Sequence, residues 1–330
     1  MIIVTGGAGF IGSNIVQALN EQGREDILVV DDLSDSSKFI NLSDLKTIDY
    51  VDRLHFQDQL SDYRVLSGVE AVFHQGACSD TMATDGREMM ETNFSFSKKL
   101  LDRCLDAGTS IIYASSAAIY GPDKNFVVGE TNEFPLNIYA YSKYLFDRLV
   151  SSRLSTCSSQ VVGLRYFNVY GPREKHKGRM ASVVYQMFEQ FEDTGEIRLF
   201  EGTSGFNHGE QRRDFVSVKD VVSVNLHMFQ NTKIRGIANV GSGKSRSFND
   251  VALLVINTCR EIRGMSALSL EAAQKKGVIT YFPMPEELED KYQNFTEANL
   301  DSLRNLGFDR EMIAAENGVG EYVRYLFDNK

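Results

Sequence analysis

A tyrosine and a lysine four positions apart are the first side chains in this sequence that could perform acid–base chemistry. Tyr139 and Lys143 open the stretch Tyr139–Leu154, which we expect to be helical, and residues i and i+4 share one helical face. An ammonium group beside a phenol favours the tyrosinate, so we expect Lys143 to lower the pKa of Tyr139. Such a tyrosine can take the proton of an alcohol while hydride leaves the carbon. Tyr141 is a second aromatic candidate, but it is out of phase with Lys143.

A serine near the end of a predicted strand can act with this pair. Ser116 follows the apolar run Ile111–Ala114, and its hydroxyl could hold the same substrate oxygen. We interpret Cys78 as a packing residue rather than a nucleophile. The four cysteines form no CxxC pair and the five histidines do not cluster, so we expect no metal site and a reducing compartment.

A glycine-rich turn at the start of the chain predicts a dinucleotide site. The strand expected at Ile2–Val4 runs into Thr5-Gly6-Gly7-Ala8-Gly9-Phe10-Ile11-Gly12, and a helix is expected over Ile11–Glu21. Small residues let the backbone approach a pyrophosphate, and the helix N-terminus offers free N–H groups. The cofactor contacts predicted in this turn are Gly6, Gly9, Phe10, Ile11 and Gly12.

The end of the second predicted strand bears on the choice between NAD and NADP. Asp31 and Asp32 lie about 20 residues past the glycines, where an acid can bind the ribose 2′-OH of NAD; a simple strand-end turn is the alternative. Lys38 and Arg53 follow, and both could reach the 2′-phosphate of NADP. From the residues alone, the two cofactors are about equally supported. Further contacts are expected after the strand Ala71–His74, at Gln75, Gly76, Ala77, Cys78 and Ser79.

The elements that must hold these residues alternate along the first half of the chain. Strands are expected at Ile2–Val4, Ile27–Val30, Ala71–His74, Ile111–Ala114 and Val161–Arg165, and helices at Ile11–Glu21, Asn93–Ala107 and Tyr139–Leu154. This alternation predicts a Rossmann-type, doubly wound parallel sheet with a smaller, mostly helical substrate-binding domain. We assign residues 1–167 and about 215–247 to the cofactor domain, and 168–214 and about 248–330 to the substrate domain. Phe215–Val222 and Ile237–Val240 are expected to be short strands, and 283–291 a loop with proline.

Composition narrows the possible partners. The 330 residues carry a net charge of −10, which disfavours nonspecific binding to nucleic acid or to anionic membranes. No apolar run approaches the ~18–20 residues of a membrane span. A strand is expected from the first residues, which leaves no room for a signal peptide, so we expect a cytoplasmic protein.

Taken in order, these motifs resemble the extended short-chain dehydrogenase/reductase family, which includes nucleotide-sugar epimerases and dehydratases. Several segments are similar to one branch of it, the ADP-L-glycero-D-manno-heptose 6-epimerases of lipopolysaccharide core synthesis. These segments are GACSDT at 76–81, RYFNVYGPR at 165–173, EKHKGRMAS at 174–182, FEG at 200–202 and KYQNFT at 291–296.

The resemblance implies a reaction. In that branch NADP⁺ removes hydride from C6″ of an ADP-activated heptose, the transient ketone turns, and hydride returns to its other face. Two proton-handling groups are needed, and by position they are Tyr139 and Lys177. From sequence alone, Lys177 could equally be a phosphate contact or a solvated lysine. The resemblance also implies a homo-oligomer, a pentamer in that branch.

The resemblance also implies which side chains meet the ligands. For the cofactor it adds Thr92, Lys143, Val169 and Lys177. For the substrate it implies Ser116, Asn168, Arg179, Gln186, Phe200, Glu201, Gly202, Thr203, Arg213 and Tyr292. A guanidinium suits a diphosphate, although Arg213 could instead pair with Asp214.

This sequence departs from the branch at several of these positions. The members that it resembles have Asn at the positions of Asp32 and Thr92, Lys at that of Arg53 and His at that of Gln186, and some have Ser at that of Arg179. A carboxylate at position 32 opposes a phosphate and so weakens the case for NADP.

Three other functions compete with this interpretation. A nucleotide-sugar dehydratase would carry an Asp-Glu pair after the serine, where this chain has Ala117-Ala118. A UDP-sugar 4-epimerase would not account for His176-Lys177-Gly178, the HKG segment. A noncatalytic NADP-sensing protein is the third, and the complete set of Ser116, Tyr139 and Lys143 argues against it.

Overall fold

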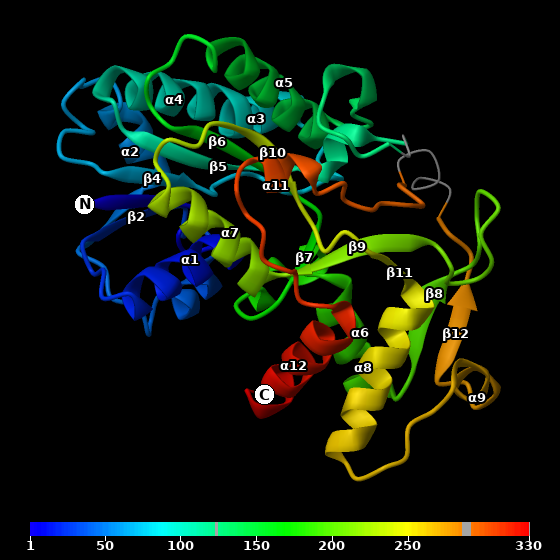
Figure 1. Cartoon of the computed structure of the whole chain (residues 1–330). Coiled ribbons are helices and arrows are strands. Elements are labelled where there is room, and N and C mark those ends of the chain that lie inside the picture. Colours follow the sequence, from blue (N-terminus) through cyan, green and yellow to red (C-terminus); the bar gives the residue numbers. More distant parts are fainter. Residues whose placement is uncertain (123–124, 286–291, 330) are drawn as a thin grey trace.

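The computed structural model describes residues 1–122, 125–285 and 292–329, and it is built around a seven-stranded parallel sheet (Figure 1). The strand order is β10-β6-β5-β4-β1-β2-β3. The strands are β1 (Ile2–Thr5), β2 (Ile27–Asp31), β3 (Asp49–Asp52), β4 (Ala71–His74), β5 (Ser110–Ser116), β6 (Val161–Tyr166) and β10 (Gly236–Val240). All of their pairings are parallel, so their carboxyl ends lie at one edge.

Helices cover both faces of this sheet, as a doubly wound fold requires (Figure 1). Ile2 and Val4 of β1 pack with α1 (Phe10–Glu21) and α7 (Val218–Gln230). Ile3, which points to the opposite face, packs in a second cluster that also contains side chains of α2 (Arg53–Gln59), α4 (Phe96–Ala107) and α5 (Ile138–Arg153). The predicted Rossmann-type sheet is therefore confirmed.

The rest of the chain forms smaller sheets around a separate core. A three-stranded sheet contains β7 (Asn168–Tyr170), β9 (Arg212–Ser217) and β11 (Ser245–Ser247), and a two-stranded one contains β8 (Ile197–Phe200) and β12 (Ile279–Phe282). The helices of this part are α6 (Val183–Thr194), α8 (Phe248–Ile262), α9 (Leu270–Lys275) and α12 (Ala315–Asp328). The short helix α11 (Asp301–Asn305) instead packs beside β10, where Leu303 joins the core of the main sheet. Apolar side chains of α6, α8 and α12 form the core of this part, and these three helices lie close together in Figure 1.

Short helical segments carry several candidate site residues. They are η1 (Ser36–Asn41), α3 (Gly86–Met90), η2 (Glu91–Ser95), η3 (Ala117–Tyr120), η4 (Glu130–Asn132) and η5 (Lys175–Met180). The segment η2 is a π-helical turn, so the helix expected at Asn93–Ala107 begins with a π turn before α4. Within the described ranges, no helix is both long and apolar enough to cross a membrane.

The strand expected at Phe215–Val222 is wrong in its second half. The chain leaves β9 at Ser217, whose side chain accepts a hydrogen bond from the N–H of Lys219 and caps α7. The buried valines that follow include Val218, Val221 and Val222, which have helical spacing on one packed face. Their β-branched side chains produced the strand prediction. The expected strand Ile237–Val240 does join the main sheet, beside β6.

Candidate active site

A cavity of about 860 Å³ lies at the carboxyl edge of the main sheet and extends to α6, α8 and β9. The predicted site residues that line it are Gly6, Gly9, Phe10, Ile11, Gly12, Asp31, Lys38, Gln75, Gly76, Ala77, Cys78, Ser79, Ser116, Tyr139, Lys143, Asn168, Val169, Lys177, Arg179, Gln186, Phe200, Arg213 and Tyr292. Residues from all parts of the sequence thus meet at the place where parallel sheets bind ligands.

The glycine turn is shaped to admit a phosphate. Gly6 has φ of +68°, and a Cβ there would lie 2.6 Å from the backbone nitrogen of Gly76. A Cβ on Gly12 would lie 2.1 Å from the carbonyl oxygen of Gly6, so only glycine allows this packing. The N-cap of α1 is Gly9, and no side chain caps the helix. The first N–H groups of α1 are therefore available to an anion, as a dinucleotide pyrophosphate requires.

Asp31 and Lys38 form the wall of the cavity at the end of β2. The buried Asp31 carboxylate accepts hydrogen bonds from the Ala8 N–H (2.8 Å) and from Lys38 Nζ (3.1 Å). Lys38 also donates to the Asp32 carbonyl oxygen (2.7 Å). Asp32 and Arg53 are not among the lining residues. The Asp32 carboxylate accepts from the Ser34 N–H, and this bond, with weaker contributions from Lys38 and Arg53, lowers its pKa.

Ser116, Tyr139 and Lys143 come together as the motifs predicted. Lys143 is 6% exposed, donates to the Ala114 carbonyl oxygen (3.0 Å), and burial lowers its pKa to about 8. The expected lowering of the Tyr139 pKa is wrong for this structure. Burial disfavours the tyrosinate and raises that pKa, although a hydrogen bond with Ser116 partly offsets the effect. Tyr141 is 43% exposed and lies outside the cavity lining.

Lys177 lies on η5 and lines the same cavity as Tyr139. Its Nζ is 5.7 Å from the centre of the Phe10 ring, next to the glycine turn. Burial lowers the pKa of Lys177, and the nearby Glu174 carboxylate acts in the opposite direction. A lysine with a lowered pKa loses its proton more readily than a solvated one. The cavity therefore holds two groups on different elements that can exchange protons.

Arg213 is a buried cation without an acidic partner among the described residues. It is 7% exposed, and its guanidinium carbon lies 4.7 Å from the centre of the Tyr292 ring. The alternative pairing with Asp214 does not form, because that carboxylate accepts from Ser242, Gly243 and Ala298. Burial lowers the pKa of Arg213. Such a guanidinium is suited to a diphosphate.

Arg179 and Gln186 lie at the rim of the cavity. The exposed Arg179 side chain forms a salt bridge with Asp80 (2.8 Å), which joins η5 to the segment after β4. Gln186 donates to the carbonyl oxygens of Arg179 and Ala181, both at 2.9 Å. These contacts hold η5 against the start of α6.

Some predicted site residues do not line the cavity. Glu201, Gly202 and Thr203 follow β8 and bond to the protein itself, as in the hydrogen bond from Thr203 to Asn294 (2.9 Å). Thr92 is also outside, because the π turn η2 instead buries Asn93. The Asn93 amide accepts from the Cys78 N–H (2.8 Å) and donates to its carbonyl oxygen (2.9 Å). Of the segment at 291–296, Lys291 lies outside the described residues.

Asn41, Asn93 and His176 are site residues that were not predicted from the sequence. Asn41 and Asn93 act on backbone groups far away in the sequence, and no local pattern marks such contacts. His176 stands beside Lys177 in the HKG segment and lines the cavity. Its place in that segment was the available signal.

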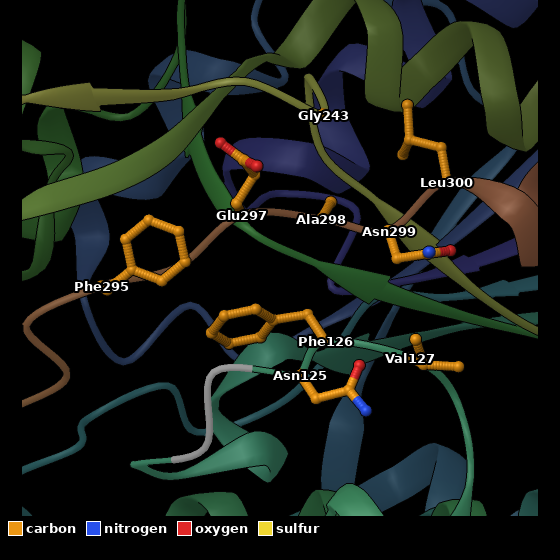
Figure 2. A pocket seen from close by; sticks show the side chains of 9 residues that line it. All are labelled: Asn125, Phe126, Val127, Gly243, Phe295, Glu297, Ala298, Asn299 and Leu300. Carbon is orange, nitrogen blue, oxygen red and sulfur yellow. The ribbon is translucent and has the colours of Figure 1, made fainter.

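A second cavity, of about 540 Å³, is shown in Figure 2. It lies between the segment 125–127 and the segment 295–300, beside the aromatic rings of Phe126 and Phe295. Glu297, the one carboxylate among the described residues that line it, accepts from the N–H and hydroxyl groups of Ser245. We assign no chemistry to this cavity.

The fold and the first cavity define a class of protein. A parallel sheet with a glycine turn, and Ser116, Tyr139 and Lys143 around one cavity, are the features of short-chain dehydrogenase/reductase-like enzymes that use a nicotinamide dinucleotide. Residues 2–241 match the model of the "NAD dependent epimerase/dehydratase family", and the chain belongs to this family.

Relatives identify the branch. The chain is 48% identical over 327 residues to an ADP-L-glycero-D-manno-heptose-6-epimerase of Thiobacillus denitrificans, which covers 99% of this chain and 98% of the relative. A crystal structure of the corresponding Helicobacter pylori enzyme is 30% identical, with a TM-score of 0.79 over 99% of this chain and 96% of that one. A UDP-glucose 4-epimerase of Thermotoga maritima is 28% identical, with a TM-score of 0.77 over 99% of each chain. The resemblance to the heptose 6-epimerase branch is thereby confirmed, and the chain is an epimerase, an enzyme of the isomerase class.

Proposed function

We propose that this enzyme converts ADP-D-glycero-D-manno-heptose to ADP-L-glycero-D-manno-heptose by inverting C6″, and so supplies heptose for the lipopolysaccharide core. The observation that carries the proposal is the presence of Tyr139 and Lys177 in one cavity, on α5 and η5. Inversion of a carbinol carbon needs a proton-handling group for each orientation of the hydroxyl. A simple reductase needs only one.

The proposed roles follow from the contacts. Ser116 holds the substrate oxygen beside Tyr139, which accepts the hydroxyl proton. Lys143 carries a positive charge close to neutrality and favours the tyrosinate in the loaded site. Lys177 donates or accepts the proton once the transient ketone has turned. A nicotinamide dinucleotide bound at the glycine turn would supply the hydride acceptor for C6″ and the hydride donor for the ketone.

The substrate diphosphate is assigned to Arg213, which stacks on Tyr292 and has no acidic partner in the described part of the chain. Asn168, Phe200, Arg179 and Gln186 line the same cavity and are assigned to the sugar and nucleotide. The cofactor is assigned as NADP, with its pyrophosphate on the glycine turn and its 2′-phosphate near Lys38. The enzyme is proposed to act in the cytoplasm as a homopentamer. Residues 1–167 and about 215–247 would bind the cofactor, and the remainder would bind the substrate.

Incubation with ADP-D-glycero-D-manno-heptose, followed by NMR of the sugar, tests this function. Interconversion of the two C6″ epimers without net consumption of nucleotide is the expected result. UDP-glucose serves as the comparison substrate, because the fold also matches a UDP-glucose 4-epimerase. Inversion of UDP-glucose alone would show a 4-epimerase. If neither sugar changes while NADP binds, a noncatalytic nucleotide-binding protein is the better interpretation.

A further inference from the structure

His176 lies in the cofactor region of the cavity without a role in the mechanism above. It is half-buried, on η5, and lines the cavity together with Lys38, Asp31 and Asp35. In the Rossmann fold the end of β2 receives the adenosine ribose of the dinucleotide. His176 therefore stands beside the part of the cofactor that distinguishes NADP from NAD.

A single asparagine fixes the orientation and the tautomer of this histidine. The amide nitrogen of the buried Asn41 lies 3.0 Å from the carbonyl oxygens of both Ala8 and Arg173. Two carbonyl acceptors require the NH₂ group at that position. An amide nitrogen accepts no hydrogen bond, so its third neighbour, His176 Nδ1 at 3.1 Å, cannot carry a proton toward it and instead shares one of the two N–H groups as an acceptor. A neutral ring whose Nδ1 accepts carries its proton on Nε2. The free donor of His176 is therefore Nε2–H.

Further contacts hold the chain just before η5. The guanidinium of Arg173 donates to the Asn41 carbonyl oxygen (2.8 Å), to Gln17 (3.2 Å) and to Asp44. The Pro172 carbonyl oxygen accepts from Asn14 of α1 (3.0 Å). The segment that carries His176 is thus bound to the glycine turn, α1 and η1, which form the cofactor half of the cavity.

The carboxylates near His176 already have hydrogen-bond partners, so the neighbouring cations can also bind an anion. Burial lowers the pKa of His176, and Lys38 and Lys177 lower it further, whereas Asp35 and Asp31 act in the opposite direction. Asp31 already accepts from Ala8 and Lys38, and Asp35 from the N–H and hydroxyl groups of Ser37. Because Lys38 is shared with Asp31 and with the Asp32 carbonyl oxygen, a phosphate at this place needs a second donor.

We propose that His176 is a specificity-determining residue for NADP, and that its Nε2–H, beside Lys38, binds the 2′-phosphate of the cofactor. Asn41 is the positioning residue that aims this donor. The inference rests on the proposed use of NADP, and it adds a ligand to the residues assigned above. A hydrogen bond to a charged phosphate exceeds an ordinary one in strength, so its loss should be measurable as affinity.

Two substitutions of His176 distinguish loss of the Nε2–H donor from a general effect on the fold. His176→Asn keeps an oxygen near the Nδ1 position that can accept from Asn41, but it loses the donor at Nε2. His176→Gln places an amide N–H near the Nε2 position. The full chain, freed of bound nucleotide, is titrated with NADP⁺ and with NAD⁺ by calorimetry.

We expect His176→Asn to weaken NADP⁺ by about tenfold or more and NAD⁺ by less than about twofold. His176→Gln should retain most of the affinity for NADP⁺. An unchanged ratio of the two affinities in His176→Asn overturns the inference, and so does equal weakening of both nucleotides, which would indicate the pyrophosphate. Equal losses in the two variants would refute the donor role. If the unaltered enzyme prefers NAD⁺, both the proposed cofactor and the role of His176 are wrong. The proposed inversion of the sugar is tested separately and does not depend on this result.

Discussion

Burial sets the acid–base properties of the individual residues in the cavity. It lowers the pKa values of Lys143 and Lys177 and raises that of Tyr139. All three shifts have the same cause, because a charged group loses hydration in the cavity. The lysines thereby approach the range in which proton transfer near neutrality is efficient, while the pKa of Tyr139 moves away from it.

Replacement of Tyr139 by phenylalanine tests the first of the two proton-handling groups. We expect Tyr139→Phe to reduce turnover by at least ~10²-fold, the usual contribution of a positioned acid–base group, while the nucleotide still binds. Epimerisation rate and nucleotide affinity are measured together. Tyr141→Phe is the matched control, since Tyr141 belongs to the same motif but is exposed. If turnover is lost in Tyr141→Phe instead, the acid–base role belongs to Tyr141.

Replacement of Lys177 by methionine tests the second group. We expect Lys177→Met to impair inversion strongly, because the ketone would lack a proton partner in one orientation, and to leave the fold unchanged. Lys175→Met is the control, because Lys175 lies on the same segment η5 but is exposed and outside the cavity lining. A dismutation assay with an aldehyde analogue shows whether one face still reacts. If Lys177→Met inverts the sugar at the normal rate, the two-group mechanism is wrong.

At the scale of elements, polar contacts join the ends of strands to the helices that follow. His74, at the end of β4, is 3% exposed and bonds to Thr5 of β1 (2.6 Å) and to Ser97 of α4 (2.8 Å). Ser97 donates its own proton to the Asn93 carbonyl oxygen, so it accepts from His74 Nε2–H. The neutral ring is therefore satisfied at both nitrogens, and burial lowers its pKa to about 3.

Because of His74, we expect the free energy of unfolding to decrease at acid pH. Below its ordinary pKa of 6.5 the unfolded chain binds a proton that the folded chain does not bind until about 3. The stabilisation is complete above 6.5 and is lost as pH falls, by about 1.4 kcal/mol per pH unit. Urea unfolding of wild type and His74→Gln should therefore show a steeper loss in the wild type below about pH 6. His55→Gln, at an exposed histidine of α2, should follow the wild type; identical slopes for His74→Gln would contradict the assignment.

Charge is distributed unevenly over the whole molecule. The net charge is −10, but the cavity is lined by Lys38, Lys143, Lys177, Arg179 and Arg213 against the carboxylates of Asp31, Asp35 and Asp80. An acidic surface disfavours other polyanions in general, while the cavity offers cations to phosphates. This arrangement favours a doubly charged nucleotide sugar and a dinucleotide as the ligands.

The same charges lead to a prediction about the cofactor. We expect the purified protein to retain NADP(H) in preference to NAD(H), because Lys38 faces the cavity where the adenosine ribose is expected. Nucleotide is extracted from the protein and separated by chromatography. A predominance of NAD would instead assign Asp31 to the ribose hydroxyls and contradict the proposed cofactor.

The assembly state can be tested on the intact chain. The exposed apolar side chains Phe39, Ile40, Ile48 and Leu54 come from one stretch of chain that runs from η1 into α2, and large exposed apolar groups often mark interfaces. We expect native mass spectrometry to give a particle of five 37.1 kDa chains. A single-chain mass at micromolar concentration would rule out the proposed pentamer.

The sequence by itself determined most of the architecture of the cofactor half, although the edge strand β3 was not predicted. Each of the strands expected from β-rich runs, from Ile2–Val4 to Val161–Arg165, is present with small differences at its ends. Apolar periodicity and glycine spacing are local properties, and they follow from backbone geometry and burial. The same logic failed at Val218–Val222, where a run of valines can form either a strand or a buried helical face.

The tertiary structure alone decided which side chains meet. It placed Tyr139 rather than Tyr141 in the cavity, left Asp32 and Arg53 outside the lining, and kept Arg213 apart from Asp214. It also joined Asn41 to His176 across 135 positions of the chain. Such pairs depend on how helices and strands pack, and they obey no period or spacing along the sequence. Desolvation depends on the same packing, which is why the pKa of Tyr139 shifted in the direction opposite to the one expected from its neighbour in the helix.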